Sequence, residues 1–323
     1  MLRYIIKRMI SLIPVIIIVS IMLFTLTKLM PGDPAKHMIN PALKAEQFKV
    51  AYEAMRRKLG SDQPYPVQYF KWISNTIRGE FGWSSLYNRP VKEAVAEPIK
   101  NTVILNILVI LLDLAITIPV GIYCAVKRGS FFDRFWQVFS LATYSMPSFF
   151  VALTLIFIVA IKLKLLPAGG MPISAYGKDF YYYTSWFKYM LLPAITLTII
   201  GLAGTIRYVR NSMLDALSED YIRTARSKGL SEKVVIYSHA FRNALIPIST
   251  IFIWTIFSLF SGSAITETIF AWNGIGRVLV KAVQNRDIML VCTMNLFFSV
   301  LSIVANFVAD LTYGFIDPRI KLE

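Results

Sequence analysis

The chain alternates between long apolar runs and polar segments that carry most of its charge. A helix needs about 20 mostly apolar residues to cross a bilayer, and six stretches meet that requirement. They cover residues 9–29, 101–126, 135–161, 189–206, 244–266 and 288–310. The pattern therefore predicts an all-α integral membrane protein with six transmembrane helices. The first run follows three basic residues, as a signal peptide would, but it continues to Leu29 without a small-residue cleavage pattern, so we expect a retained span.

The composition supports the membrane assignment. Hydrophobic residues make up 56% of the 323 positions, whereas about 45 to 50% is typical of soluble domains. The net charge of +15 resides in loops between the apolar runs, which fits membrane topology better than nucleic-acid binding. Cys124 and Cys292 both fall inside predicted spans and far from any CxxC spacing. We therefore expect neither a disulfide framework nor a thiolate metal site.

The basic residues also predict an orientation, because short cytoplasmic loops are enriched in Lys and Arg. The N-terminus, the loop after the second span and the stretch 207–242 are all rich in these residues. We assign these segments and both termini to the cytoplasm. The segment 30–96 is then extracytoplasmic, and helical spacing over residues 42–59 predicts a small ordered cap there.

The stretch from Arg207 to Pro247 is a charged segment between two predicted spans. Its first half, from Ser218 to Gly229, begins with a capping serine and ends with a glycine, with acids in its first turn and bases in its last. A second helix is predicted to start at Ser231 and to run into the next span. Its apolar face is predicted to comprise Val234, Tyr237 and Phe241. These features predict a docking surface for a protein outside the bilayer.

The residues required for membrane-embedded hydrolysis are missing from the sequence. His37 and His239 are the only histidines, and the sequence contains neither HExxH nor the phosphate-binding GxxxxGK. We predict no catalytic, metal-binding or cofactor-binding residues, and no ATP hydrolysis by this chain itself.

Asp113 is an acid near the middle of the second span. A charge there costs about 2.5 to 3.5 kcal/mol if it faces lipid, so the side chain must face protein or water. A packing role and a place in the translocation path both remain open. Five prolines inside the predicted spans are also expected to kink helices. They are Pro14, Pro119, Pro147, Pro193 and Pro247.

Several segments resemble the first permease subunit of oligopeptide and dipeptide ABC importers. The resemblance covers nearly the whole chain, with signatures at 31–34, 63–69, 78–83, 145–149, 192–196, 220–230, 267–272, 274–277 and 317–319. Within the importers' coupling loop, Arg223-Thr-Ala225 replaces Glu-Ala-Ala, and Pro247 lies 18 residues after Gly229 instead of 13. Asn273 stands where the family pattern has proline.

The resemblance implies a type I ABC importer transmembrane domain that forms the pore of a bacterial or archaeal cell-membrane peptide importer. Its implied partners are a second homologous permease, two cytoplasmic ATPases that use ATP and Mg²⁺, an extracytoplasmic peptide-binding protein and membrane lipid. The ATPase contact is placed at the coupling loop 207–247. Its residues are Tyr221, Arg223, Thr224, Ala225 and Gly229. Nickel or another solute as cargo, and a membrane receptor or scaffold, remain alternative functions.

Four regions follow from these observations. Residues 1–29 form the N-terminus and first span, and 30–96 the extracytoplasmic segment. Residues 97–310 form the permease domain, and 311–323 a cytoplasmic tail.

Overall fold

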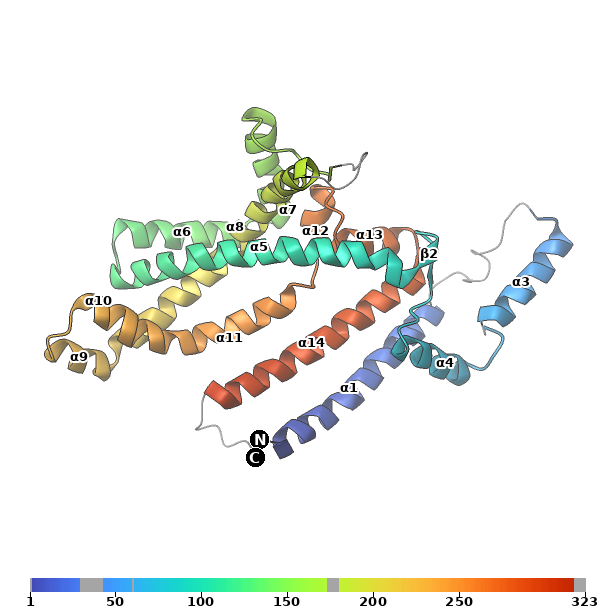
Figure 1. Cartoon of the computed structure of the whole chain (residues 1–323), viewed down its shortest axis with the longest axis horizontal. Coiled ribbons are helices and arrows are strands. Elements are labelled where there is room, and N and C mark those ends of the chain that lie inside the picture. The colour runs from blue at the N-terminus through green and yellow to red at the C-terminus, as the bar shows by residue number, and fades with distance from the viewer. Residues whose placement is uncertain (1, 30–42, 60, 173–179, 317–323) are drawn as a thin grey trace. The chain divides into compact units, whose positions relative to one another are not determined.

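The computed structural model describes residues 2–29, 43–59, 61–172 and 180–316, and these are mostly helical (Figure 1). The first part of the chain contains α1 (Leu2–Leu29), α3 (Ala45–Leu59), α4 (Tyr65–Ile77), β1 (Trp83–Ser84), β2 (Arg89–Pro90), α5 (Val91–Val126), α6 (Phe131–Ser145), α7 (Ser148–Leu155) and the π-helix η1 (Ile156–Lys162). The second contains α8 (Phe180–Ser218), α9 (Asp220–Ser227), α10 (Glu232–Val234), the π-helix η2 (Val235–Phe241), α11 (Arg242–Ser258), α12 (Ala264–Ile269), α13 (Ile275–Gln284) and α14 (Ile288–Ile316). The predicted signatures at 31–34 and 317–319 lie outside the described residues.

The all-α membrane class is confirmed, and each of the six predicted spans is helical over most of its length. Among the described residues, α1, α5, α8 and α14 are each long and apolar enough to cross a membrane. The third predicted span is a bent pair, α6 followed by α7 and η1. The fifth corresponds to α11, whose 17 residues extend about 26 Å, slightly less than the ~30 Å hydrocarbon core. The count of six spans therefore stays a prediction.

Proline affects these helices unequally. At Pro147 the chain bends by 108° between α6 and the α7–η1 pair, and Pro147 itself adopts an extended conformation with ψ 139°. Its ring removes a backbone donor, so the α6 hydrogen-bond pattern cannot continue through it. At Pro14, Pro119, Pro193 and Pro247 the helix continues. The predicted kink is confirmed at Pro147, and at the other four prolines it stays a prediction.

The chain divides into two compact units, residues 1–98 with 278–304, and residues 99–277 with 305–323. In the first unit, α4 packs on α1, where the Tyr69 hydroxyl lies 2.8 Å from Ser20 Oγ. The β1–β2 hairpin is held by Asp287, which accepts hydrogen bonds from the Ser84 hydroxyl and the Leu86 backbone N–H. The helix predicted from the spacing over 42–59 is confirmed as α3 (Ala45–Leu59), while the extracytoplasmic location of this segment stays a prediction.

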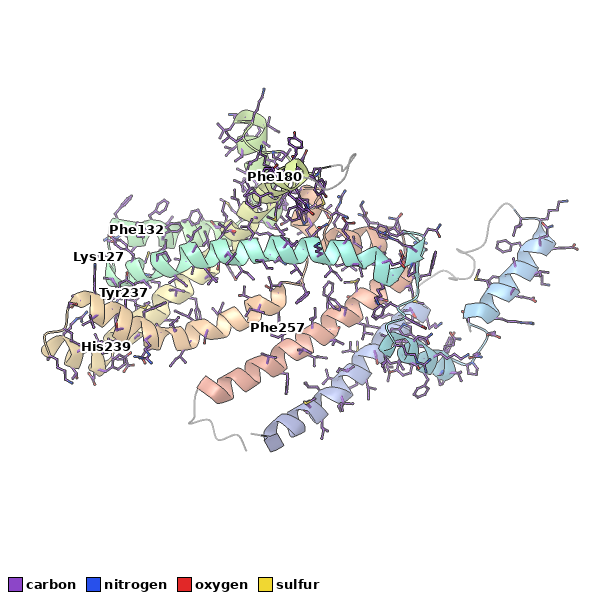
Figure 2. All side chains as sticks on the ribbon, in the orientation of Figure 1. Lys127, Phe132, Phe180, Tyr237, His239 and Phe257 are labelled. Atoms are coloured by element: carbon purple, nitrogen blue, oxygen red, sulfur yellow. The ribbon has the colours of Figure 1, made fainter. Side chains whose placement is uncertain are left out.

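The second unit is organised around α8, which packs against α6, α7 and α11. Its 39 residues extend about 58 Å, about twice the hydrocarbon thickness, so α8 continues well past the predicted span. Lys127 and Phe132 at the α5–α6 corner lie at the same end of this unit as Tyr237 and His239 of η2 (Figure 2). Val126, at the end of α5, packs against the apolar cluster that contains Val235 and Ala240 of η2, so the two internal loops predicted to be cytoplasmic are neighbours.

Candidate functional site

The α8–α9 corner begins the charged helix pair, which we define as residues 218–242. α8 ends at Ser218, Glu219 is extended, and α9 starts at Asp220. The predicted Ser218 cap is wrong, because its hydroxyl donates to the Asp215 carbonyl oxygen within the α8 end instead of capping α9. The predicted glycine stop is confirmed, since Gly229 has φ +74°. This left-handed conformation strains residues with a Cβ.

The second helix of the pair differs from the prediction in its winding. After the short α10, the backbone winds as the π-helix η2 before α11 begins. Its i→i+5 spacing puts Val235 and Ala240 in the core, while Val234 is 38% and Tyr237 57% exposed. Phe241 packs against this core, so the predicted apolar face of Val234, Tyr237 and Phe241 is confirmed at Phe241. It is wrong at Val234 and Tyr237, because it assumed an α-helical period.

The predicted ATPase-contact residues fall into two groups. Tyr221, Arg223 and Thr224 are exposed on α9, and Arg223 makes a long ion pair of 3.5 Å with Asp220. Ala225 lies on the opposite side of α9 and is only 5% exposed. The two-turn helix α9 therefore has one exposed face and one buried face. Ala225 lies on the buried face and packs in the apolar core.

The buried face of the pair joins it to two long helices. Ile222 and Ala225 of α9 and Val235 of η2 belong to one apolar cluster. The α5 and α8 members of this cluster are Ile122, Ala125, Val209, Met213 and Ala216. This close-packed cluster connects α9 to α5 and α8.

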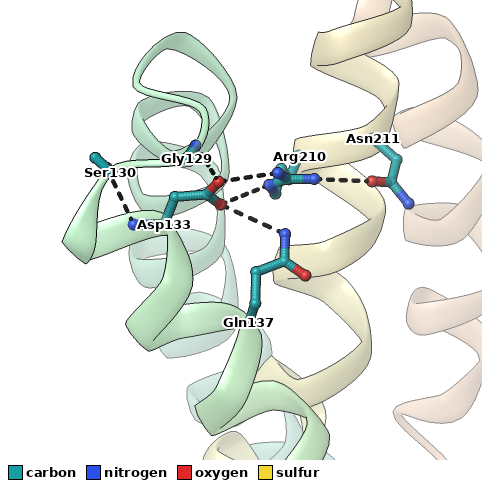
Figure 3. A network of polar contacts seen from close by, with 6 residues as sticks. All are labelled: Gly129, Ser130, Asp133, Gln137, Arg210 and Asn211. Carbon is teal, nitrogen blue, oxygen red and sulfur yellow. Dashed lines mark hydrogen bonds and ion pairs between the residues drawn. The ribbon is translucent and has the colours of Figure 1, made fainter.

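A buried ion pair, which sequence reasoning missed, fixes α8 to the start of α6. Arg210 binds both carboxylate oxygens of Asp133, with its Nε 2.6 Å from Oδ1 and its Nη2 2.9 Å from Oδ2 (Figure 3). The same carboxylate accepts the Gly129 backbone N–H at 2.9 Å, and Ser130 caps the α6 N-terminus. The Ser-x-x-Asp spacing was the available signal, since it is typical of a helix start.

Asp113 belongs to α5, and its side chain, which faces α8, is nearly buried, with the residue 9% exposed. Its Oδ1 accepts a hydrogen bond of 3.0 Å from the Thr205 hydroxyl and one of 3.4 Å from Thr117. A Cβ added to Gly201 would lie 3.3 Å from the same oxygen. The helices therefore approach closely at this carboxylate, as a packing role requires.

Glu267, 1% exposed, is a further buried acid of this unit, besides Asp133 and Asp113. Its oxygens accept hydrogen bonds from the Thr102 hydroxyl at 2.8 Å and the Arg277 backbone N–H at 3.0 Å. Burial raises the pKa of Glu267. A Cβ on Gly274 would approach the carboxylate to 2.5 Å, so the glycine permits this close contact. The network joins α5 to α12 and the first turn of α13.

The sequence matches two family models whose combined length covers most of the chain. Residues 117–322 match the binding-protein-dependent transport system inner membrane component. Residues 1–88 match the N-terminal part of such membrane components.

Curated relatives align along their full lengths. The probable peptide ABC transporter permease protein y4tP of Sinorhizobium fredii is 36% identical, covering 98% of this chain and 99% of the relative. The oligopeptide transport system permease protein AppB of Bacillus subtilis is 35% identical, covering 99% and 100%. The glutathione transport system permease protein GsiC of Escherichia coli is 36% identical over all of both chains. The chain belongs to the family of inner membrane components of binding-protein-dependent transport systems.

Proposed function

We propose that this chain is a pore-forming permease subunit of an ATP-driven importer of peptides. The observation that carries the proposal is its similarity over the full length to permeases named for peptides, oligopeptides and glutathione. Peptide cargo is favoured over nickel because each of these names denotes a peptide or a peptide-like thiol.

The energy for transport comes from separate chains in this proposal. Since the sequence contains no GxxxxGK motif, ATP and Mg²⁺ are bound by two partner ATPase subunits. A second homologous permease completes the pore, and an extracytoplasmic binding protein delivers the peptide. With 207–242 and both termini in the cytoplasm, the exposed face of α9 meets the ATPase.

The packing of the helix pair supports a role in coupling. An ATPase that pushes on α9 displaces its buried residues Ile222 and Ala225, which pack on α8 and α5. The Asp133–Arg210 ion pair then carries the motion from α8 to α6. Gly229 supplies the turn that closes the pair. Alternating access would follow from rigid-body movement of these connected helices.

Asp113 has a packing role in this proposal, because Thr117 and Thr205 satisfy one of its oxygens in a nearly buried site. A place in the translocation path is the competing hypothesis, and its test is given in the Discussion.

Co-purification tests the assignment. The chain, expressed with the second permease and the ATPases from the same organism, should yield a complex with two ATPases per permease pair. A chain that accumulates in the membrane but never retains an ATPase would instead support the receptor or scaffold alternative.

A further inference from the structure

A cavity of about 530 Å³ opens beside the charged helix pair. Its walls come from α8, the first turn of α9 and the first turns of α11, all within the second unit. The lining residues are Tyr208, Asn211, Ser212, Asp215, Ala216, Glu219, Tyr221, Asn243, Ala244 and Pro247. Of these, only Tyr221 is among the residues predicted to contact an ATPase.

The α8 side of the cavity is one polar face of that helix. Tyr208, Ser212 and Asp215 follow one another at intervals of four and three residues, a spacing that aligns side chains on a single helix face. Glu219, the extended residue between α8 and α9, also lines the cavity, so two carboxylates lie at this end. Both acids are exposed, and neither forms an ion pair within the described part of the chain.

The floor of the cavity is small and nearly buried. Ala216 is 8% and Ala244 2% exposed, so short side chains create the depth. Ser212 is also 8% exposed and lines the cavity, and its hydroxyl forms no hydrogen bond with another described residue. The hydroxyl oxygen is not among the enclosed unpaired polar atoms of the described structure, so it is open to the cavity as an unused hydrogen-bonding group.

The charge of the cavity contrasts with its surroundings. The neighbouring stretch carries basic residues on both sides of the acids, namely Arg207, Arg210, Arg223, Arg226, Lys228, Lys233 and Arg242. Glu219 also contributes, after burial, to raising the pKa of Tyr221. A negatively charged recess within a basic surface attracts a cation and repels the phosphate of an anionic lipid.

We propose that this cavity receives an arginine or lysine side chain of the partner ATPase. Such a side chain combines an apolar stem, which suits Ala216, Ala244 and Pro247, with a donor head that suits the carboxylates and the Ser212 hydroxyl. Tyr221 lines the cavity and also lies on the exposed face of α9, so the cavity is continuous with the surface assigned to the ATPase. This inference rests on the proposed function.

The first test measures binding of the cognate ATPase to the permease pair in nanodiscs. Asp215→Asn combined with Glu219→Gln should weaken binding about tenfold and reduce its dependence on salt. Glu93→Gln combined with Glu97→Gln is the matched control, because it also removes two exposed acids, which belong to α5 and line neither the cavity nor the face of α9 assigned to the ATPase. Its effect should be at most twofold. Equal losses in the two variants, or unchanged binding when Asp215 and Glu219 are replaced, would overturn the proposal. Failure of the unaltered chain to bind ATPase would instead refute the proposed function.

The second test leaves both acids in place. A photo-crosslinking amino acid at Asn211, which lines the cavity, should capture an ATPase peptide that contains arginine or lysine. Capture confined to the second permease, or to residues 317–323 of this chain, would overturn the assignment. Because this variant keeps Ser212, Asp215 and Glu219, the result does not depend on the folding of the charge variants.

Discussion

At the residue scale, Asp133 and Arg210 form the best-buried ion pair of the described structure, with side chains 4% and 14% exposed. Removing one partner of such a pair leaves an unpaired buried charge, which typically costs 3 to 5 kcal/mol. Asp133→Ala should therefore lower the free energy of unfolding by about 3 kcal/mol, measured by thermal unfolding in detergent.

Two controls separate this effect from general loss of charge. Asp133→Leu combined with Arg210→Met should recover much of the loss, because neither charge is then buried alone. Arg223→Gln breaks an exposed pair and should cost less than 1 kcal/mol. Equal destabilisation by Asp133→Ala and Arg223→Gln would contradict the structure.

Glu267 predicts a pH dependence of stability. Because burial raises its pKa above the ordinary 4.5, the folded protein holds a proton at pH values where the unfolded chain has released it. The stabilisation by this group is therefore complete below about pH 4.5 and declines as pH rises toward the folded-state pKa. Glu267→Gln should remove this decline. Parallel curves of melting temperature against pH for the two proteins would show that the acid does not titrate as proposed.

Asp113→Asn distinguishes packing from a role in the path. The amide keeps an acceptor oxygen for Thr205 and Thr117, so a packing role predicts normal uptake with membrane accumulation reduced by no more than about twofold. A path role predicts uptake altered several-fold while accumulation is unchanged. Quantitative immunoblotting beside an uptake assay separates the two results.

At the element scale, helix existence could be predicted from the sequence, while helix winding could not. Apolar run length identified all six segments, and the charges and Gly229 located α9. The π-helix η2 was missed because an α-helical period fits the same apolar residues, and only packing against α8 shows that Val235 and Ala240 are buried. The Asp133–Arg210 pair was missed because its members lie 77 positions apart, a separation that a single sequence does not connect.

The turn between α9 and α10 gives the prediction for this scale. Gly229 has φ +74°, and a Cβ placed there meets no atom within 4 Å. A substitution therefore acts through backbone strain alone. Gly229→Val should cost about 1 to 2 kcal/mol of local stability and weaken ATPase binding several-fold, whereas Gly229→Asn should have little effect because asparagine tolerates this conformation. A pull-down with the cognate ATPase measures ATPase binding by each variant. Similar losses of binding in Gly229→Val and Gly229→Asn would argue against backbone strain as the cause.

At the scale of the whole molecule, polar contacts hold α5 at Thr102 and just beyond its last residue. Thr102 binds Glu267, and Gly129, three residues after α5 ends at Val126, donates its backbone N–H to Asp133. Thr102 and Val126 are about 36 Å apart along the helix. That distance slightly exceeds the hydrocarbon thickness. In the proposed importer, such a helix would carry movement from the side assigned to the ATPase to the side assigned to the binding protein. Sequence alone predicted the family and the coupling loop, but not the contact of Thr102 with Glu267, since it joins distant segments.

The central claim is that this chain forms the pore of an ATP-driven peptide importer, and reconstitution tests it most directly. The chain is placed in proteoliposomes with its second permease and ATPases, and uptake of a labelled peptide is measured with the binding protein present. The account predicts uptake that requires hydrolysable ATP on the ATPase side and peptide-stimulated ATP hydrolysis. Peptide entry that is indifferent to ATP, or hydrolysis without any peptide entry, would contradict it.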